Sequence, residues 1–486
     1  MNEAIRSLAP AQIWSNFADL NAVPRPSKKE ERVIQFMMDF GKSLHLETFK
    51  DRVGNVIIRK PASSGMENRK KVVLQSHLDM VHQKNATTDF NFDTQGIAMY
   101  IDEDWVRAKG TTLGADNGIG VAAIMALLQS TTIPHPALEA LFTIDEETGM
   151  TGAMGLEAGI LNGSILLNLD TEEDDEIDIG CAGGIDVTAT ATYKEVALKA
   201  GFKGYEITVK GLHGGHSGID IHKGFGNANK IMNRILYQAD THYAARIVEV
   251  MGGSLRNAIP RESMAKIVVP EKMSDRFEND FKDWAATIKT ELSATEPGLT
   301  LLLKPCETIK KVMENEAGFN LIRALYAAHN GVYAMSSTIA DLVETSNNVA
   351  KVVVKNGAIE IACLTRSSVD SAKLDLANAL KSTFELAEYQ VRFSGNYPGW
   401  KPNADSAILK VLTEKYKQLF TESPKVVACH AGLECGILGN HYPEMDMISF
   451  GPTIRGAHSP DERVSISSVQ KFWKFLLEIL KDIPAA

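Results

Sequence analysis

The chain of 486 residues has few cysteines, no long apolar run and no surplus of basic residues. Its five cysteines are scattered and form no Cys-x-x-Cys pair, which argues against a zinc finger and fits a reducing cytoplasm best. The longest uninterrupted apolar run, residues 121–128, is far too short to span a membrane. The first residues, Met1 to Arg6, lack the basic start and apolar core of a signal peptide. We therefore expect a cytoplasmic protein without a membrane partner.

Acidic residues outnumber basic ones, with 61 Asp and Glu against 51 Lys and Arg and a net charge of −10. This balance argues against nucleic acid or an anionic membrane as a partner, because no stripe of Lys and Arg offsets it. Hydrophobic content of 44% and charged content of 23% are ordinary for a folded globular protein. A chain of this length exceeds what one hydrophobic core normally serves, so two domains are expected.

The N-terminal third alternates between helical and strand-like patterns. Helices are expected from residue 11 onward, over residues 29–44 and over residues 118–130. The expected strands are residues 55–59, 71–75, 141–144 and 164–169. This alternation predicts an α/β fold with a largely parallel sheet flanked by helices.

From about Asp186 the strand patterns change character. Polar and apolar residues now alternate strictly, which is typical of half-exposed antiparallel strands. The alternating segments are residues 186–192, 205–210, 351–355 and 358–363. We expect an inserted α+β domain at residues 187–397, with the first domain, residues 1–186, resuming over residues 398–486.

Glu146 and Glu147 are the most informative residues of the chain. They follow an apolar stretch, residues 137–144, that is typical of a buried strand, and the pattern breaks at Gly149. Both acids are therefore expected at the tip of a strand, where open α/β sheets bind their ligands. Most neighbouring glutamates are simply solvated, so this pair gains meaning only beside other candidate ligands.

His77 and Asp79 follow the predicted strand at residues 71–75. Residues two apart in a strand point the same way, so the two side chains are well placed to interact. A carboxylate beside a metal-binding imidazole orients the ring and raises its basicity. His-x-Asp is also a common accident, and the pair alone decides nothing.

Three other segments carry candidate ligands. Asp116 lies in a glycine-rich turn before a helix, where a capping role is the simpler interpretation. Asp170 ends a strand and runs into an acidic segment, residues 172–176, that we interpret as a solvated loop. His458 lies in a loop just after a strand.

Together these segments supply two histidines and several carboxylates at predicted strand ends or turns. One bridging carboxylate, with one histidine and one further carboxylate for each ion, makes a two-metal hydrolytic centre. Mixed nitrogen and oxygen ligands suit Zn²⁺, with Co²⁺ or Mn²⁺ as alternatives. A spare carboxylate beside a ligand can take a proton from a water molecule that the ions make more acidic.

The same segments closely resemble the motifs of the M20 family of metallopeptidases. Within that family the resemblance is greatest to the aminoacyl-histidine dipeptidases, also called cytosolic non-specific dipeptidases or peptidase D. The matching segments, in the family's order, are residues 77–81, 114–118, 145–149, 168–170 and 456–459. They extend over nearly the whole chain. The resemblance implies metal-dependent hydrolysis of unblocked dipeptides, including those with a C-terminal histidine.

The resemblance also implies the role of each candidate residue. Asp116 would bridge two divalent metal ions, most consistent with Zn²⁺. The implied ligand set is His77, Asp116, Glu147, Asp170 and His458. Glu146 would be the general base and Asp79 the partner of His77. In this family the peptide bond that follows the bridging aspartate is often cis.

The inserted domain would be the lid of the family, with residues that contact the substrate. His216 resembles the lid histidine that stabilises the tetrahedral oxyanion, although a surface histidine in a glycine-rich turn is the simpler interpretation. Asn257 resembles a lid asparagine that contacts the substrate. Arg366 matches the arginine that grips the C-terminal carboxylate of the substrate as a bidentate pair. Glu434 lies where the family builds its substrate pocket, and it would either face the free amino group or have a structural role.

The lid departs from the simplest family members, because it is roughly twice as long. Two arrangements stay open: the lid supplies His216 within its own chain, or it pairs with a second lid in a homodimer. Three other functions stay open as well. They are an M20 aminoacylase or deacetylase acting on N-acyl amino acids, a glutamate-releasing carboxypeptidase, and a metal-binding protein without catalytic activity.

Overall fold

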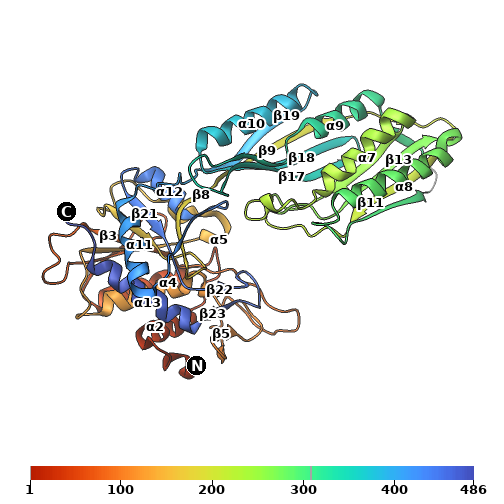
Figure 1. The fold of residues 1–486 in the computed structure, drawn as a ribbon. Helices are drawn as coiled ribbons and strands as arrows, with labels where there is room; N and C mark the ends of the chain where they lie inside the picture. The colour runs from red at the N-terminus through yellow and green to blue at the C-terminus, as the bar shows by residue number, and fades with distance from the viewer. Residues whose placement is uncertain (1, 307–308) are drawn as a thin grey trace. The chain divides into compact units, whose positions relative to one another are not determined.

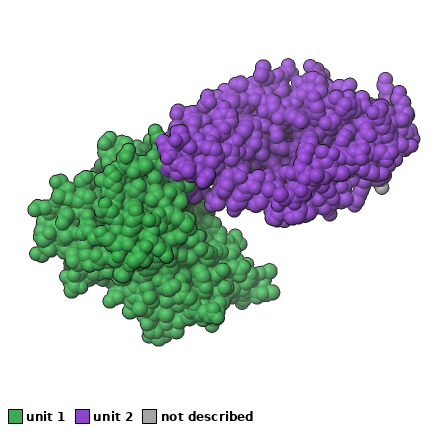
Figure 2. Space-filling view, in the orientation of Figure 1, with its two compact units in different colours: residues 1–180, 400–428, 433–486 green, residues 181–399, 429–432 purple. Residues whose placement is uncertain are grey.

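The computed structural model describes residues 2–306 and 309–486, which form two compact units (Figures 1 and 2). The first unit consists of Met1–Gly180, Trp400–Ala428 and Leu433–Ala486. The second unit consists of Cys181–Gly399 and Cys429–Gly432. Within the described residues, no helix combines the length and apolar character that crossing a bilayer requires.

An eight-stranded sheet forms the centre of the first unit. In spatial order its strands are β1 (Glu47–Lys50), β2 (Val56–Lys60), β6 (Leu138–Thr143), β3 (Val72–His77), β7 (Ile165–Asn168), β21 (Asp446–Ser449), β8 (Glu176–Cys181) and β20 (Lys425–Cys429). The four strands from β6 to β21 are parallel, whereas β1, β2 and β8 pair antiparallel. Every residue of β3 is buried, as expected for a strand covered on both faces.

Helices and a small second sheet complete the first unit. The helices are α1 (Glu3–Arg6), α2 (Ala11–Asn21), α3 (Glu31–Ser43), α4 (Ala115–Gln129), α5 (Glu146–Gly149), α6 (Thr151–Gly155), α11 (Ala407–Phe420), α12 (Glu434–His441) and α13 (Ile466–Lys481). The small sheet contains β22 (Ile454–Arg455), β23 (Arg463–Ser465), β5 (Trp105–Ala108) and β4 (Met99–Asp102). Helix α4 is apolar and buried nearly throughout, because it packs between β3 and α2.

The second unit is built on one long, mainly antiparallel sheet. In spatial order its strands are β14 (Thr300–Cys306), β11 (Phe202–Lys210), β13 (Ser263–Pro270), β12 (Arg246–Gly252), β17 (Val343–Lys355), β18 (Ala358–Ser367), β9 (Gly183–Thr192) and β19 (Gln390–Tyr397), with β16 (Gly331–Met335) paired to β17. A two-stranded sheet joins β10 (Glu195–Ala197) and β15 (Lys311–Met313).

Four helices pack on this long sheet (Figure 1). They are α7 (Ala228–Tyr243), α8 (Ser274–Glu291), α9 (Asn315–Ala327) and α10 (Asp370–Glu385), and the short 3₁₀ helices are η1 (Ile221–Lys223) and η2 (Glu271–Met273). Alternate residues of β11, such as Tyr205, Ile207 and Val209, join the core that these helices cover. The predicted α/β fold with an inserted α+β part is therefore confirmed.

The parallel order of β6, β3 and β7 positions the candidate site. Parallel strands end at the same edge of a sheet, so the residues that follow them meet there. His77 ends β3, Glu146 follows β6 after two residues, and Asp170 follows β7 after one. Three segments that are far apart in the sequence thus carry polar side chains to one edge.

Candidate active site

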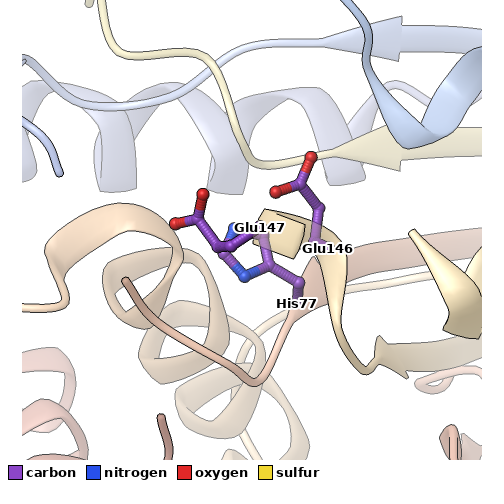
Figure 3. Close-up of side chains that lie close together, drawn as sticks. All are labelled: His77, Glu146 and Glu147. Atoms are coloured by element: carbon purple, nitrogen blue, oxygen red, sulfur yellow. The ribbon is translucent and has the colours of Figure 1, made fainter. Parts of the chain in front are cut away.

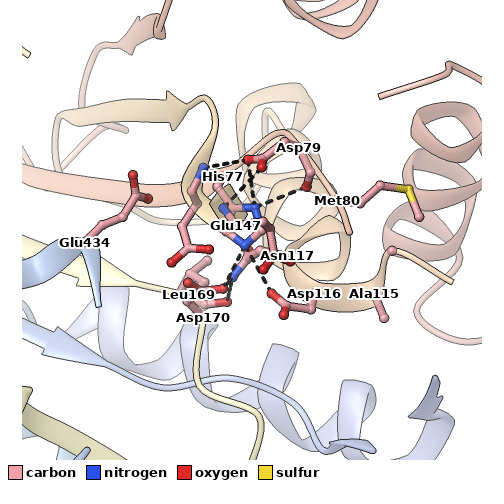
Figure 4. Close-up of polar contacts among 12 residues, drawn as sticks. His77, Asp79, Met80, Ala115, Asp116, Asn117, Glu147, Leu169, Asp170 and Glu434 are labelled. Atoms are coloured by element: carbon pink, nitrogen blue, oxygen red, sulfur yellow. Dashed lines mark hydrogen bonds and ion pairs between the residues drawn. The ribbon is translucent and has the colours of Figure 1, made fainter. Parts of the chain in front are cut away.

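His77 faces two carboxylates that come from other elements (Figure 4). Its Nε2 lies 3.1 Å from Asp116 Oδ1 and 3.5 Å from Asp170 Oδ1. Asp116 belongs to the first turn of α4, and the peptide bond after it is cis, as expected. The three side chains offer donor atoms that all lie within 4.8 Å of one another. We call them the first donor group.

A second donor group contains Asp116, Glu147 and His458. His458 Nε2 lies 3.3 Å from Asp116 Oδ2 and 2.9 Å from Glu147 Oε2. These side chains too offer donor atoms within 4.8 Å of one another. Asp116 therefore presents one oxygen to each histidine, which is the arrangement of a carboxylate that bridges two ions.

The two donor groups fit divalent metal ions. Tetrahedral zinc with bonds near 2.0 Å holds its ligand atoms about 3.3 Å apart, and the separations here are 2.9 to 3.5 Å. Glu147 Oε1 is buried and has no hydrogen-bond partner among the described residues. Hydrogen bonds to Asp116 and Glu147 raise the pKa of His458 to about 11. The two carboxylates therefore strongly favour a positive charge beside them.

Asp79 contacts both His77 and the pair of glutamates. Its Oδ1 lies 3.3 Å from His77 Nδ1 and accepts the backbone N–H of Glu146 at 3.0 Å. Its Oδ2 accepts the Ser27 hydroxyl at 2.8 Å and the N–H of Glu147 at 3.3 Å. Burial alone would raise the pKa of Asp79, but these contacts hold it below its usual range. Strand β3 ends at His77, so Asp79 lies beyond the strand, and strand alternation does not explain this contact.

Glu146 begins the single-turn helix α5, and its carboxylate lies beside His77 and Glu147 (Figure 3). One of its oxygens is within 4.8 Å of donor atoms on both of these residues. It is absent from the two donor groups that share Asp116. Loss of hydration raises the pKa of Glu146 well above its usual range, and the negative charges of Asp170 and Glu147 add to that shift.

Glu434 is fully buried at the start of α12, and only one of its oxygens is occupied. Oε2 accepts Gln75 Nε2 at 2.6 Å and the Thr143 hydroxyl at 2.6 Å. Oε1 has no hydrogen-bond partner in the described part of the chain. Burial raises the pKa of Glu434 to about 8. A buried carboxylate oxygen without a partner is suited to a donor that a ligand brings.

A chain of buried hydrogen bonds runs from Glu434 across the ends of the central strands. Its members, in order, are Glu434, Gln75, Asn168, Ser449, Thr171 and Asp178. Thr171 Oγ1 lies 2.8 Å from both Ser449 Oγ and Asp178 Oδ2, and Ser449 Oγ also bonds Asn168 Oδ1. Two hydroxyl protons cannot fill these three contacts. With the Gln75 and Asn168 amides oriented as they are here, the chain is complete when Asp178 carries a proton, which agrees with a pKa that burial raises to about 7.

We expect Asp178→Asn to stabilise the protein at pH 9 relative to wild type, and to do so much less at pH 5. The pKa of Asp178 is raised to about 7 in the folded state, against about 3.9 in an unfolded chain. Protonated Asp178 therefore contributes to the free energy of unfolding at low pH. This contribution falls by roughly 1.4 kcal/mol for each pH unit as the pH rises toward 7. Urea unfolding of the metal-free protein at several pH values measures the difference between the two proteins.

The exposed Asp405→Asn is the matched control for this prediction, because it removes one carboxylate that has no such contacts. Its stability difference from wild type should change little with pH. Glu176 is the charged neighbour that acts on Asp178, and it is the same in all three proteins. A difference between Asp178→Asn and wild type that stays constant from pH 5 to 9 would show that Asp178 is ionised in the folded protein.

In the second unit, Arg366 is buried at the end of β18 with its guanidinium held on several sides. Its Nη1 donates to Tyr397 Oη at 2.9 Å and its Nε to Ser217 Oγ at 3.3 Å. Its Nη2 lies 3.4 Å from His216 Nε2. We call Arg366, Tyr397, Ser217 and His216 the anion cradle.

The tautomer of His216 follows from its backbone contacts. Its Nδ1 accepts the N–H groups of Gly218 at 3.2 Å and Ile219 at 3.1 Å. Burial lowers the pKa of His216 to about 4, and the charge of Arg366 adds to the shift. The ring is therefore neutral at pH 7, with its proton on Nε2. Two donors, His216 Nε2 and Arg366 Nη2, then face each other, an arrangement suited to an anionic oxygen that accepts from both.

Asn257 lies beside His216 in the same unit. The backbone oxygen of Asn257 accepts the N–H of Ser217 at 2.8 Å, and Gly215 accepts the N–H of Ile259 at 2.9 Å. The loop that carries Asn257 is thereby bonded to the loop that carries His216. Arg366, His216 and Asn257 are thus brought together within one unit, as the metal-ligand candidates are in the other.

The acidic segment that follows Asp170 was predicted to be a solvated loop, and the structure shows it fixed by ion pairs. Glu173 pairs with Arg455 at 2.8 Å, and Asp174 pairs with Lys471 at 2.8 Å. The sequence could not show these partners, because they come from the C-terminal end of the chain. The segment adds no member to the two donor groups.

Two buried charged residues near the site, Arg25 and Glu462, are not predicted from the sequence to have a role there. Arg25 stands between two prolines, and Glu462 follows His458 by four residues. Neither belongs to a donor group, yet both bond to the backbone of the loops that carry the ligands. A charged residue fixed between two prolines is the one local pattern that could have drawn notice to Arg25.

The sequence and the fold were compared with those of known proteins. The model of peptidase family M20/M25/M40 matches residues 73–482. The chain is 45% identical over 481 residues to the cytosol non-specific dipeptidase of Escherichia coli (strain K12), covering 99% of both chains. It is 46% identical, with a TM-score of 0.93, to the crystal structure of aminoacylhistidine dipeptidase from Vibrio alginolyticus, covering 99% of this chain and 98% of that one. An aminopeptidase from Bacillus cereus shares the fold, with a TM-score of 0.58 at 15% identity.

Proposed function

The chain belongs to the M20 family of peptidases, and we propose that it is a dipeptidase that hydrolyses dipeptides with free ends, including Xaa-His dipeptides. The observation that carries the proposal is the pair of donor groups joined by Asp116, with Glu146 beside both. Two relatives support it by their names, since one is called a non-specific dipeptidase and the other an aminoacylhistidine dipeptidase. We assign the role of a lid to residues 187–397.

The two donor groups would hold two divalent ions, with Zn²⁺ as the ion that their donor set suits best and Co²⁺ or Mn²⁺ as alternatives. His77 and Asp170 would complete one site, Glu147 and His458 the other, and Asp116 would serve both. Bound ions would polarise the peptide carbonyl and lower the pKa of a nearby water molecule toward ~7.

Glu146 is the proposed general base. It takes the proton of the attacking water at its carboxylate and delivers that proton to the leaving amine. Asp79 supports both halves of the site, because its carboxylate contacts the His77 ring and accepts the N–H groups that begin α5. It therefore fixes the orientation of a ligand and the position of the base at once.

The polar groups that recognise the substrate are proposed as follows. Arg366 binds the C-terminal carboxylate, and the Nε2–H of His216 donates to oxygen that becomes negative during the reaction. Asn257 contacts the substrate next to His216. The free oxygen of Glu434, Oε1, accepts a hydrogen bond from the substrate's amino group. The anion cradle is complete within one chain, so we propose that no second chain is needed to build it.

The proposal is tested by hydrolysis with metal-stripped protein before and after Zn²⁺, Co²⁺ or Mn²⁺ is added. The substrates are β-Ala-His, Gly-His, Ala-Leu, a tripeptide and an N-acetylated dipeptide. We expect cleavage of the free dipeptides alone, and only after an ion is added. The tripeptide should resist cleavage because its carboxylate lies one residue too far from the scissile bond.

Other outcomes of the same experiment identify other functions. Cleavage of the N-acetylated compound alone indicates an aminoacylase, since that substrate has no free amine for Glu434. A dipeptide that ends in glutamate is added to the panel, because cleavage of that substrate alone indicates a glutamate-releasing carboxypeptidase. Silence on every substrate, with ions bound, indicates a metal-binding protein without catalytic activity.

A further inference from the structure

Arg25 and Glu462 are buried side chains of opposite charge, with exposures of 1% and 2%. Neither supplies a donor atom to either group, and both bond mainly to backbone atoms. Buried charges are costly to maintain unless each is matched by hydrogen bonds, so their contacts indicate what they hold in place.

The Glu462 carboxylate accepts hydrogen bonds from four backbone N–H groups at the start of α4. Its Oε2 accepts from Leu113 at 2.7 Å and Gly114 at 3.0 Å. Its Oε1 accepts from Ala115 at 2.8 Å and Asp116 at 3.3 Å. Successive N–H groups around a left-handed glycine form an anion-binding concavity, and Gly114 has a φ of +70°. A carboxylate from the far end of the chain fills that concavity.

Glu462 follows His458 by four residues, at the end of the same loop. The N–H of Glu462 bonds the backbone oxygen of Ser459 at 3.0 Å, and β23 begins directly after it. The Glu462 side chain therefore joins the loop of His458 to the loop of Asp116. These two residues share the second donor group.

Arg25 joins a different pair of loops. Its Nη1 donates to the backbone oxygens of Leu78 at 3.0 Å and Asp79 at 3.1 Å. Its Nη2 donates to the backbone oxygen of Gly114 at 2.6 Å. The loop after His77 is thus bonded to the loop before Asp116, and His77 and Asp116 share the first donor group.

The glycine-rich sequence around Asp116 leaves room for this guanidinium. A Cβ atom on Gly114 would lie 2.5 Å from Arg25 Nη2, and one on Gly118 would lie 2.7 Å from it. Because the guanidinium is fixed by its own hydrogen bonds, it cannot move aside without losing them.

We propose that Glu462 and Arg25 are positioning residues, each of which sets the geometry of one metal site: Glu462 that of Asp116, Glu147 and His458, and Arg25 that of His77, Asp116 and Asp170. Neither residue is a member of a donor group. The inference rests on the proposed two-metal function, because it assigns one positioning residue to each metal site. Partners that orient metal ligands typically change metal affinity by about 10–100-fold when they are replaced.

The test measures Zn²⁺ dissociation constants by competition with a chelator in two single-site backgrounds. His77→Ala keeps the second donor group, and His458→Ala keeps the first. We expect Glu462→Gln to weaken binding about 10–100-fold in the His77→Ala background, where it affects the loops of both His458 and Asp116. The loss should be smaller in the His458→Ala background, where only the loop of Asp116 is affected. Arg25→Lys should show the reverse pattern.

The neighbouring Asp461→Asn is the matched control, because it removes an exposed carboxylate from the same turn and should change neither constant. If Glu462→Gln does not fold, Glu462→Asp keeps the charge, shortens its reach and should give the same pattern. Equal losses in both backgrounds, or no loss in either, would overturn the inference. A chain that binds two Zn²⁺ ions with the expected pattern and cleaves no dipeptide would contradict the proposed function and leave this inference standing.

Discussion

Glu146→Gln is expected to lower kcat by about 10²–10⁴-fold while the protein still binds its ions. The carboxylate lies next to both donor groups and belongs to neither of those that share Asp116. Glutamine has nearly the same shape and keeps the backbone N–H that Asp79 accepts, so the α5 turn should be preserved. It has no oxygen that can hold a proton taken from water. Steady-state kinetics and bound zinc per chain, measured on the same preparation, check the prediction.

The neighbouring Glu147→Gln is the contrasting variant. Its Oε2 lies 2.9 Å from His458 Nε2, so its replacement removes a proposed ligand. Activity should fall in both variants, but only Glu147→Gln should lose zinc and recover in part when excess zinc is added. Near-normal turnover in Glu146→Gln would mean that another group accepts the proton. Loss of zinc from that variant would instead make Glu146 a ligand.

Most of the ligand candidates could be proposed from the sequence because they lie at the end of a strand with a strong local pattern, and the family resemblance then implied the full set. His77 follows an apolar run, and Glu146 and Glu147 follow another. Parallel strands place such ends at one edge, so the alternation of strands and helices was enough to predict that they meet. Which oxygen of Asp116 faces which histidine depends on the kinked start of α4, and that is visible only in the structure.

The supporting contacts could not be predicted, because they join segments with no common pattern. Glu462 bonds to N–H groups about 350 residues away, and a lone glutamate before a strand gives no sign of such partners. In the sequence, nothing distinguishes Asp178 from the other acidic residues. In the structure, its contact with Thr171, which also contacts Ser449, places it at the end of a buried series of hydrogen bonds, where it is expected to be protonated. Long-range polar contacts of this kind are set by tertiary packing and leave no period in the sequence.

In the anion cradle too, a motif indicated one residue, and only the structure shows the residues that contact it. Arg366 was proposed from its motif, but Tyr397 and Ser217, which occupy two of its nitrogens, were not. With these two bonds made, Nη2 is the nitrogen that faces His216. The bonds to Ser217 and Tyr397 use the Nε–H and one N–H of Nη1, so the N–H groups left for the proposed carboxylate are the second one on Nη1 and the two on Nη2.

Arg366→Ala is expected to lower kcat/KM for a free dipeptide roughly 30- to 3000-fold, which corresponds to about 2–5 kcal/mol for removing one partner of a buried charge pair. Wild-type protein should cleave the dipeptide far better than the same dipeptide with an amide at its C-terminus, because the amide offers no charge to Arg366. In the variant the two substrates should be cleaved at similar rates. Measuring kcat/KM for both substrates separates recognition from a general loss of folding, which would lower both values together.

Tyr397→Phe is the matched control for the arginine variant, since it removes a single hydrogen bond to Nη1 and keeps the ring and the charge. One such bond contributes about 1 kcal/mol, so we expect roughly a fivefold loss for the free dipeptide. The preference for the free dipeptide over its amide should survive in this variant, because the guanidinium is still present. If Arg366→Ala also keeps that preference, Arg366 has a structural role in the second unit and another cation binds the carboxylate. If the preference disappears in Arg366→Ala and persists in Tyr397→Phe, the guanidinium itself selects the carboxylate.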